Sequence, residues 1–271
     1  MSLFMDFDGT ITVEDTINEV ASYALQVQAE QGDDLREEWG TVVREYMKDY
    51  GKHVAEYCPE EKARKSPTHE VGFLRELKTL ELRSLERIYK CQVFKGITRD
   101  MFRKAGQDAV RRGVVQIRPG FKEFVETKMS EGWKVWIVSV NWSSAYIEGV
   151  CDVPGITVIA NEVQDDGSIV GPDMLNQKGI GSRNLTNSRD KLDVMQAIIQ
   201  DESKPTVYFG DSVTDLECLL AASTGIVISD DEDSKLLRTL GRIGKRVPRA
   251  TRQEPYPALF WASDYQEVMN M

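Results

Sequence analysis

Carboxylate side chains gather in two short segments of this 271-residue sequence, and each segment directly follows an apolar run. The two segments are Asp6-Phe7-Asp8-Gly9-Thr10 and Gly210-Asp211-Ser212-Val213-Thr214-Asp215. Ligands of open parallel sheets bind outside the carboxyl ends of the strands. If both apolar runs are strands of one parallel sheet, Asp6, Asp8, Asp211 and Asp215 therefore lie on a shared rim.

Four carboxylates on one rim would repel one another and raise each other's pKa unless they share a positive charge. A hard divalent cation meets this need. Mg²⁺ fits because it binds one or two carboxylates, keeps several waters and accepts a substrate phosphate. Lys191, which opens a predicted helix, adds a second positive charge, and Ser139, after another apolar run, adds a hydroxyl. No histidine or cysteine stands in these segments, which argues against zinc.

This set of residues suits the hydrolysis of a phosphate monoester, a reaction that enzymes accelerate by up to ~10²¹-fold. A carboxylate nucleophile divides the reaction into two easier steps through an aspartyl phosphate. The leaving oxygen needs a proton and the attacking water must later lose one, and a second carboxyl can do both. In an extended segment, the side chains of residues i and i+2 point to the same side. The spacing of Asp6 and Asp8 therefore lets both carboxyl groups point to the same side.

The elements that must position these residues alternate along the chain. Apolar, β-branched runs predict strands, and amphipathic stretches between them predict helices. The predicted strands lie near residues 2–5, 133–140, 157–160, 206–210 and 225–228, with a hairpin return at 168–170, and the helices at 119–131, 143–150, 190–200 and 214–222. This alternation indicates an α/β fold whose parallel sheet is covered on both faces.

A long helical block interrupts this pattern after the first strand. Helix formers dominate there, and four helices, most of them amphipathic, are predicted at residues 16–31, 34–50, 69–89 and 98–111. We therefore predict an α/β core domain from residues 1–14 and 113–271, and an inserted, all-helical cap domain from residues 15–112.

The two acidic segments resemble the first and fourth motifs of the haloacid dehalogenase-like (HAD) superfamily. Ser139 after its apolar run resembles the second motif, Lys191 resembles the third, and all four occur in the family's order. The resemblance covers about two-thirds of the chain. It implies a Rossmann-like core of the HAD fold and an Mg²⁺-dependent phosphatase that acts through an aspartyl phosphate.

The resemblance also implies a role for each matching residue. Asp6 is implied as the nucleophile and a magnesium ligand, and Asp8 as the general acid and then base, with its backbone carbonyl on the metal. Asp211 is implied as a metal ligand that Asp215 supports. Ser139 and Lys191 are implied to hold the phosphoryl oxygens, with backbone N–H groups near Asn141. Relatives often have Ser-Gly-Gly where this chain has Ser139-Val140-Asn141, so Asn141 can face the substrate.

Within the superfamily, the sequence from Asp6 to Ala21 is most similar to the phosphoserine phosphatase-like branch, whose helical cap is of the C1 type. Residues 160–163, followed by Asp166-Gly167 and Gly171, resemble the same branch. Asp15 matches an acidic position that contacts substrate in that branch, where it suits an amine or a hydroxyl-rich compound. Asp15 can equally cap the helix that follows, and both roles are compatible.

Four side chains of the helical block are candidates to line a lid over the site. They are Tyr23, Trp39, Arg44 and Tyr46. Packing between cap helices explains the aromatic ones as well, and we favour that interpretation.

Charge and hydropathy exclude several classes of protein. The net charge is -10, whereas non-specific nucleic-acid binding needs basic surface. No run of about 18 apolar residues predicts a membrane span, and the first residues lack the features of a signal peptide. We therefore expect a cytoplasmic protein that binds a small phosphorylated metabolite, with no nucleic-acid or membrane partner. The basic segment 235–252 is better explained as a solvated helix and loop beside acidic neighbours.

Other functions are also compatible with some of these residues. A dehalogenase would not need Asp8, which counts against that activity. A phosphomutase or phosphotransferase would keep Asp8 but must protect the phosphoenzyme from water, and a diphosphate-cleaving enzyme is a further alternative. Outside enzymes, the alternatives are a regulator phosphorylated on Asp6 and a binding protein. Receiver-type regulators are about half this length and lack a helical cap.

Overall fold

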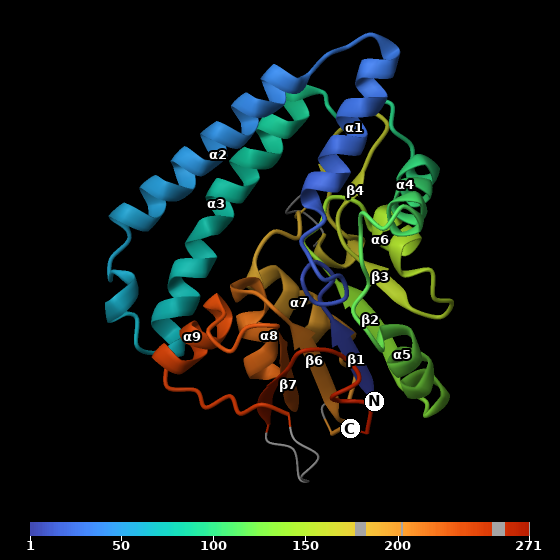
Figure 1. Ribbon diagram of the computed structural model, residues 1–271. Coiled ribbons are helices and arrows are strands. Elements are labelled where there is room, and N and C mark those ends of the chain that lie inside the picture. Colours follow the sequence, from blue (N-terminus) through green and yellow to red (C-terminus); the bar gives the residue numbers. More distant parts are fainter. Residues whose placement is uncertain (177–182, 202, 251–257, 271) are drawn as a thin grey trace.

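Parallel strands form the central sheet of this computed structural model, which describes residues 1–176, 183–201, 203–250 and 258–270 (Figure 1). The strands are β1 (Ser2–Met5), β2 (Lys134–Val138), β3 (Thr157–Ile159), β6 (Thr206–Gly210), β7 (Thr224–Ile228) and β8 (Leu259–Ala262). Their order in the sheet is β3-β2-β1-β6-β7-β8. Met5 at the end of β1 lies opposite both Ile137 and Phe209. The carboxyl ends of β1, β2 and β6 therefore meet at one edge of the sheet.

Helices cover both faces of this sheet. Side chains alternate along a strand, so Leu3 and Met5 belong to one buried cluster and Phe4 to another. On the first face lie α5 (Phe121–Ser130) and α6 (Ser144–Cys151), and on the second lie α7 (Ser188–Ile198), α8 (Leu216–Ala221) and α9 (Lys235–Arg242) (Figure 1). The predicted α/β fold with a covered parallel sheet is confirmed.

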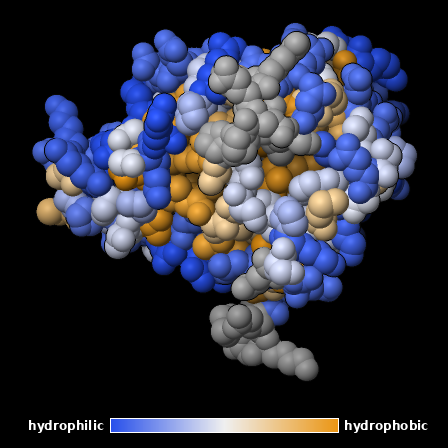
Figure 2. Space-filling view, turned by 90° about the horizontal axis from the view of Figure 1, so that it is seen from below, coloured by the Kyte–Doolittle hydropathy of each residue, from blue (hydrophilic) through white to orange (hydrophobic). Residues whose placement is uncertain are grey.

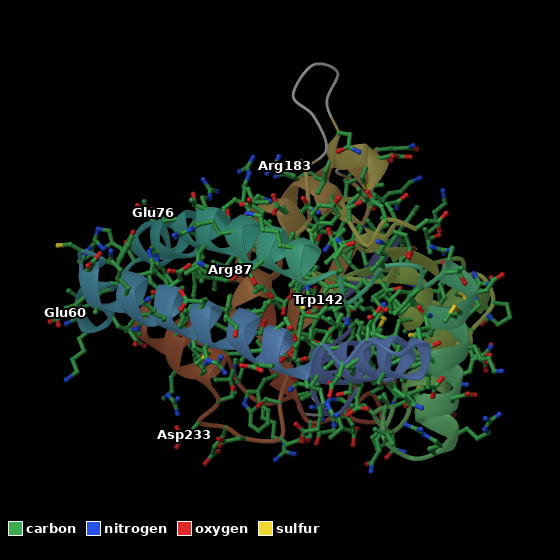
Figure 3. The ribbon with its side chains drawn as sticks, turned by 90° about the horizontal axis from the view of Figure 1, so that it is seen from above. Glu60, Glu76, Arg87, Trp142, Arg183 and Asp233 are labelled. Carbon is green, nitrogen blue, oxygen red and sulfur yellow. The ribbon has the colours of Figure 1, made fainter. Side chains whose placement is uncertain are left out.

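Four long helices stand between β1 and β2 in the chain. They are α1 (Ile17–Gln31), α2 (Arg36–Glu56), α3 (Pro67–Cys91) and α4 (Arg99–Arg111), with a short 3₁₀ turn at Glu61–Ala63. The hairpin of α2 and α3 extends above and to one side of the sheet (Figures 1 and 3). The start of α3 follows from its sequence: the Ser66 hydroxyl accepts from the His69 N–H, and Pro67 occupies the first turn, where no N–H is needed.

Helix α4 packs directly on α6 through two glycines. A Cβ atom on Gly106 would lie 2.3 Å from the Tyr146 carbonyl oxygen, and one on Gly149 would lie 2.0 Å from the Arg103 carbonyl oxygen. Only glycine allows the two backbones to approach this closely. Part of the helical block thus rests on the α/β layer, and its division from the core at residue 112 stays a prediction.

The basic segment contacts other parts of the same chain. Arg242 of α9 lies 3.0 Å from Glu70 of α3, and Glu70 also receives a 2.8 Å hydrogen bond from Arg64. Arg249 lies 2.6 Å from Glu267 and 4.9 Å above the Trp261 ring. These two arginines therefore link α9 and the following loop to α3 and to the C-terminal region. Part of the segment, including Arg252, lies outside the described residues.

The remaining elements are short. β4 (Glu162–Val163) and β5 (Ile169–Val170) form an antiparallel pair, which confirms the predicted hairpin, and Gly167 in its turn has a φ of 83°. The edge strand β8 was not predicted, although its four residues are all apolar. Two more 3₁₀ turns lie at Asp173–Leu175 and Val213–Asp215.

The two ends of the sheet present different surfaces. Near the amino ends of β1, β2 and β6, a cavity of about 270 Å³ is lined in part by Met1, Trp136, Ile198 and Ile199. Seen from below, this side of the molecule shows apolar surface between hydrophilic side chains (Figure 2). The polar residues of interest lie at the opposite end. Within the described residues, no helix combines the length and apolar character needed to cross a membrane.

Candidate active site

The carboxyl ends of β1 and β6 bring the predicted carboxylates together. Asp6 follows β1 directly, and its N–H donates to the Phe209 carbonyl oxygen at 2.9 Å. Asp211 follows β6, and Asp215 ends the 3₁₀ turn after it. One carboxylate oxygen from each of Asp6, Asp211 and Asp215 lies within 4.8 Å of the others. The structure thus places three of the four predicted carboxylates in one cluster.

Lys191 is the cation of this cluster and is fully buried. Its Nζ lies 2.8 Å from Asp6 Oδ1 and 2.7 Å from Asp215 Oδ1. The Tyr208 hydroxyl donates to the same Asp215 oxygen at 2.8 Å, and the other oxygen of Asp215 accepts from the Asp211 N–H at 3.2 Å. Asp215 thus has donors on both oxygens and holds Lys191 and the Asp211 loop in place.

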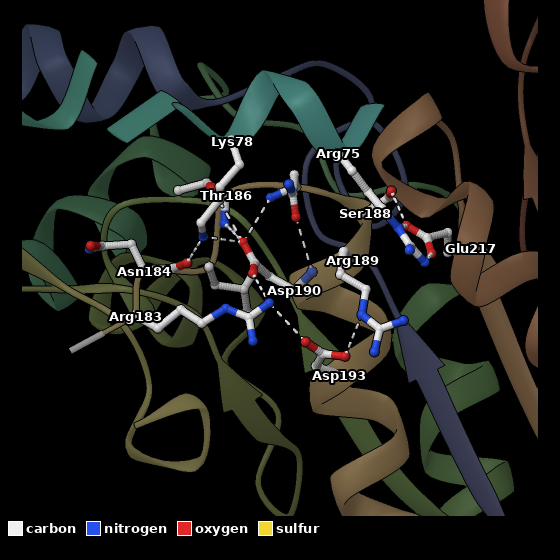
Figure 4. A network of polar contacts seen from close by, with 12 residues as sticks. Arg75, Lys78, Arg183, Asn184, Thr186, Ser188, Arg189, Asp190, Asp193 and Glu217 are labelled. Atoms are coloured by element: carbon white, nitrogen blue, oxygen red, sulfur yellow. Dashed lines mark hydrogen bonds and ion pairs between the residues drawn. The ribbon is translucent and has the colours of Figure 1, made fainter. Parts of the chain in front are cut away.

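The N-terminus of α7 positions Lys191, and Figure 4 shows the polar contacts around the preceding residue, Asp190. Asn187 and Asp190 form a reciprocal capping box at this end of the helix. Asp190 is fully buried, and its Oδ2 atom accepts from Lys78 of α3 at 2.5 Å, while Arg183 lies 2.8 Å from Oδ1. Since Lys191 follows Asp190, the helical block and the loop before α7 both help to orient the buried lysine.

Asp8 lies in a separate set of hydrogen bonds next to this cluster. Its Oδ1 atom accepts from the N–H and hydroxyl of Thr16 at 2.8 and 2.6 Å. Its Oδ2 atom accepts from Asn141 Nδ2 at 2.9 Å. The Asn141 N–H donates to the Ser139 hydroxyl oxygen at 3.1 Å, and the Asn161 side chain donates to the Asn141 carbonyl. Asn141 thus orients Asp8 and links it to Ser139.

Gly9 allows the first acidic loop to approach the second. Its φ is 72°, and a Cβ atom there would lie 2.3 Å from Asp211 Oδ2. A larger residue would be strained and would displace Asp211. The next residue, Thr10, uses its hydroxyl to donate to Asp211 Oδ1 at 2.9 Å. Gly9 therefore suits the close contact with Asp211, and Thr10 provides a hydrogen bond to the same carboxylate.

Arg118 supports the same loop and was not identified from the sequence. It is buried, and two of its nitrogens donate to the Gly9 carbonyl oxygen at 3.1 and 3.0 Å. A third nitrogen donates to Asp230 at 2.8 Å. The only signal in the sequence is a single arginine between Ile117 and Pro119, and that does not indicate which loop it contacts.

Burial and like charges shift the pKa values of the cluster. Burial raises the pKa of Asp6 well above its ordinary value and Asp215 adds to the effect, although Lys191 opposes it. Burial and Asp215 raise the pKa of Asp211 to about 7. Burial lowers the pKa of Lys191, but Asp215 and Asp6 outweigh it and leave that pKa raised. Three clustered carboxylates with one internal cation and oxygen-only donors fit a hard divalent cation.

The pKa of Asp8 is also raised. Burial is the main cause and Asp15 adds to it, while the hydrogen bonds from Thr16 and Asn141 oppose the shift. A carboxyl group that holds its proton to a higher pH is a better proton donor near neutrality.

The raised pKa of Asp211 predicts that stability without a metal depends on pH. A carboxyl whose folded-state pKa is raised stabilises the fold below its unfolded value near 4, and this contribution is lost as pH rises through about 7. In EDTA, the thermal midpoint of wild type minus that of Asp211→Asn should therefore fall by several degrees between pH 5 and pH 8. Scanning calorimetry measures this difference. Added Mg²⁺ should stabilise wild type more at pH 8 than at pH 5, because protons no longer compete with the metal for the Asp211 carboxylate. A difference independent of pH would contradict the assignment.

A cavity of about 520 Å³ opens above these residues. Asp6, Asp8, Asp15 and Asp211 line it. The Asp15 carboxylate also accepts from the Ile17 N–H at 2.7 Å. The N-cap of α1 is Thr16 rather than Asp15, so the predicted N-cap role is wrong, whereas Asp15 does lie at the cavity. The other predicted residues are fully buried behind the cavity surface. They are Ser139, Asn141, Lys191 and Asp215.

The four candidate lid residues occupy different places. Trp39 and Tyr46 line a neighbouring cavity. Tyr23 packs against Phe102, with ring centroids 6.1 Å apart. Arg44 is exposed, and its guanidinium donates to the Thr41 hydroxyl of its own helix.

Comparison with known proteins agrees with this fold. A substrate-bound phosphoserine phosphatase superposes with a TM-score of 0.52 at 16% identity, covering 99% of this chain and 96% of that one. The mitochondrial bifunctional TH2 protein of Arabidopsis thaliana is 25% identical over 264 residues. That match covers 88% of this chain but spans only 40% of the relative's length. A CTO1 family protein of Schizosaccharomyces pombe is 28% identical over 246 residues, covering 86% of this chain and 83% of the relative.

The family model described as haloacid dehalogenase-like hydrolase matches residues 3–220. The match includes both acidic loops, Ser139 and Lys191, and it extends over most of the chain. The protein therefore belongs to the haloacid dehalogenase-like hydrolase family.

Proposed function

We propose that this protein is an Mg²⁺-dependent phosphatase that hydrolyses a small-molecule phosphomonoester through an aspartyl phosphate on Asp6. The observation that carries the proposal is the arrangement of Asp6. Its carboxylate faces a cavity, one oxygen lies 2.8 Å from Lys191, and Asp8 lines the same cavity. The substrate in this proposal is a small phosphorylated metabolite, and the compartment is the cytoplasm.

In the first step, an oxygen of Asp6 attacks phosphorus while the bond from phosphorus to the leaving oxygen breaks. Asp8 donates its proton to the leaving oxygen, which departs as an alcohol. Its raised pKa supports this role, because a carboxyl that titrates at higher pH can deliver a proton near neutrality.

In the second step, a water molecule attacks the phosphorus of the aspartyl phosphate and Asp8 takes up the proton. The bond between phosphorus and Asp6 breaks, which releases inorganic phosphate and restores both carboxyl groups. Thr16 and Asn141 hold the two oxygens of Asp8 in fixed positions during this exchange.

Charge neutralisation comes from two sources in this proposal. Mg²⁺ bound by Asp6 and Asp211 would neutralise developing negative charge on the phosphoryl oxygens. Lys191 lies beside Asp6 and can contact the phosphoryl group there. The Ser139 hydroxyl accepts from Asn141 and keeps its own proton to donate. Asp215 acts through Lys191 and the Asp211 loop as a positioning residue.

Phosphate release from a panel of phosphorylated metabolites tests the proposal. The panel contains phosphoserine, sugar and polyol phosphates, vitamin phosphates and a diphosphate, each with Mg²⁺ and with EDTA. We expect release that requires Mg²⁺ and a clear preference for one class of monoester. The absence of release from every compound by folded protein with Mg²⁺ would contradict it, and release from the diphosphate alone would replace the monoester with a diphosphate substrate.

A further inference from the structure

A second cavity adjoins the candidate active site. Its volume is about 350 Å³, within the range that holds small ligands. It lies between helices α1, α2 and α3 and the loop after β2, and it shares Asp15, Ile17 and Val140 with the cavity that contains Asp6 and Asp8. A molecule with its phosphate at Asp6 can therefore extend into this second space.

Aromatic rings form much of its wall. Trp39 and Tyr46 come from α2, and Trp142 comes from the loop after β2. Trp142 packs edge-on against Trp39, with centroids 5.9 Å apart and an interplanar angle of 83°. Phe94 also packs against Trp142, with ring centroids 5.6 Å apart. Seen from above, Trp142 lies between α1 and the adjoining ends of α2 and α3 (Figure 3). Rings held in this way suit a flat ligand.

The charged side chains of this wall are all acidic. Asp15 and Glu81 line the cavity, and no lysine, arginine or histidine does so among the described residues. Glu81 is half-buried and accepts a hydrogen bond from the Tyr46 hydroxyl at 3.1 Å. Lys78, one helical turn away, is bound by Asp190 and the Asn184 carbonyl oxygen. Glu81 forms no ion pair with another described residue, so its charge is available to a cationic ligand.

The cavity also lies on the side where a leaving group must depart. Attacking and leaving oxygens are roughly in line during phosphoryl transfer, so the leaving oxygen points away from Asp6 and toward its proton donor. Asp8 is bound by Asn141, and the residues on either side of Asn141 both line the second cavity.

We propose that this cavity binds the leaving group of the substrate, and that this group is a flat ring carrying a positive charge. The proposal rests on the phosphatase function proposed above. Aromatic faces attract cations through their quadrupole, most strongly when water is excluded, and Glu81 and Asp15 supply the opposite charge.

Three phosphate esters separate the contributions of charge and shape. The first is the phosphate ester of 3-(hydroxymethyl)-1-methylpyridinium, which is flat and cationic. The second is 3-methylbenzyl phosphate, which has the same shape without the charge, and the third is phosphocholine, which has the charge without the ring. With Mg²⁺, we expect kcat/KM for the pyridinium ester to exceed that for each of the others by about tenfold or more.

The variant Glu81→Gln removes the charge and keeps an oxygen that can accept from Tyr46. It should lower kcat/KM for the pyridinium ester by about tenfold. The kcat/KM for the neutral ester should stay within about twofold of wild type, which would also show that the variant is folded. Glu76→Gln is the matched control, because Glu76 is exposed on the same helix and does not line the cavity. It should change neither rate.

The outcomes distinguish this inference from the proposed function. Hydrolysis of all three esters at similar kcat/KM, unchanged by Glu81→Gln, would overturn the cationic-ring assignment and leave the phosphatase standing. If folded wild type with Mg²⁺ hydrolysed none of the probes or panel compounds, the phosphatase proposal itself would fail. A pyridinium preference that survives in Glu81→Gln would remove Glu81 as its source and also contradict the assignment.

Discussion

Asp6→Asn is expected to lower kcat for phosphate release by about 10⁴-fold or more. The amide cannot attack phosphorus as the carboxylate does, so no aspartyl phosphate forms. Two measurements check this prediction. Steady-state phosphate release with Mg²⁺ gives the rate, and acid quenching followed by mass spectrometry detects phosphate bound to wild type and not to the variant.

The fold of Asp6→Asn should remain intact. Burial and the neighbouring Asp215 disfavour the charge on Asp6, so its removal should not lower the thermal midpoint. Lys191 also keeps its contact with Asp215 at 2.7 Å. Asp173→Asn is the matched control, because Asp173 is exposed and its change should leave both rate and stability near wild type. Activity of Asp6→Asn within tenfold of wild type would rule out Asp6 as the nucleophile.

Lys191→Met is expected to lower the free energy of unfolding by about 3–5 kcal/mol in EDTA. Removal of one partner of a buried ion pair leaves the other charge uncompensated, and here Asp6 and Asp215 both lose the lysine that lies within 2.8 Å of each. Urea denaturation with and without Mg²⁺ measures the loss. Mg²⁺ should reduce it, because a bound divalent cation restores positive charge to the carboxylate cluster.

Two comparisons make this prediction specific. Lys204→Met removes an exposed lysine whose ion pair with Asp201 spans 3.7 Å at the surface, and it should cost less than about 1 kcal/mol. Combining Lys191→Met with Asp6→Asn should cost less than the sum of the two single changes, because the second change removes a carboxylate that the first leaves unpaired. A loss no larger than that of Lys204→Met would show that Lys191 is not needed to hold the cluster together.

Both predictions concern the same balance of charge. The fold places three carboxylates around one buried lysine, and this arrangement is costly without a further cation. The clustered carboxylates that would bind metal therefore lower the free energy of unfolding of the metal-free protein. Charges arranged in this way are common at functional sites.

The order of elements and the rim of carboxylates could be predicted from the sequence because both depend on local patterns. Alternating apolar runs and amphipathic stretches indicated the parallel sheet and its helices. Strand ends then located Asp6 and Asp211, and the observed register places Met5 opposite Phe209. The close approach of Gly9 to Asp211, by contrast, was not predicted.

The contacts that hold the site depend instead on residues distant in the sequence. Lys78 reaches Asp190, Arg118 reaches Gly9, and Trp39 meets Trp142. The choice among possible partners is made when helices pack at particular distances and angles, which no local pattern encodes. Local patterns are therefore enough to predict the class of fold and the acidic residues at the strand ends. The contacts that hold Lys191 and Asp8, and the aromatic, acidic cavity beside them, arise only when distant segments pack together.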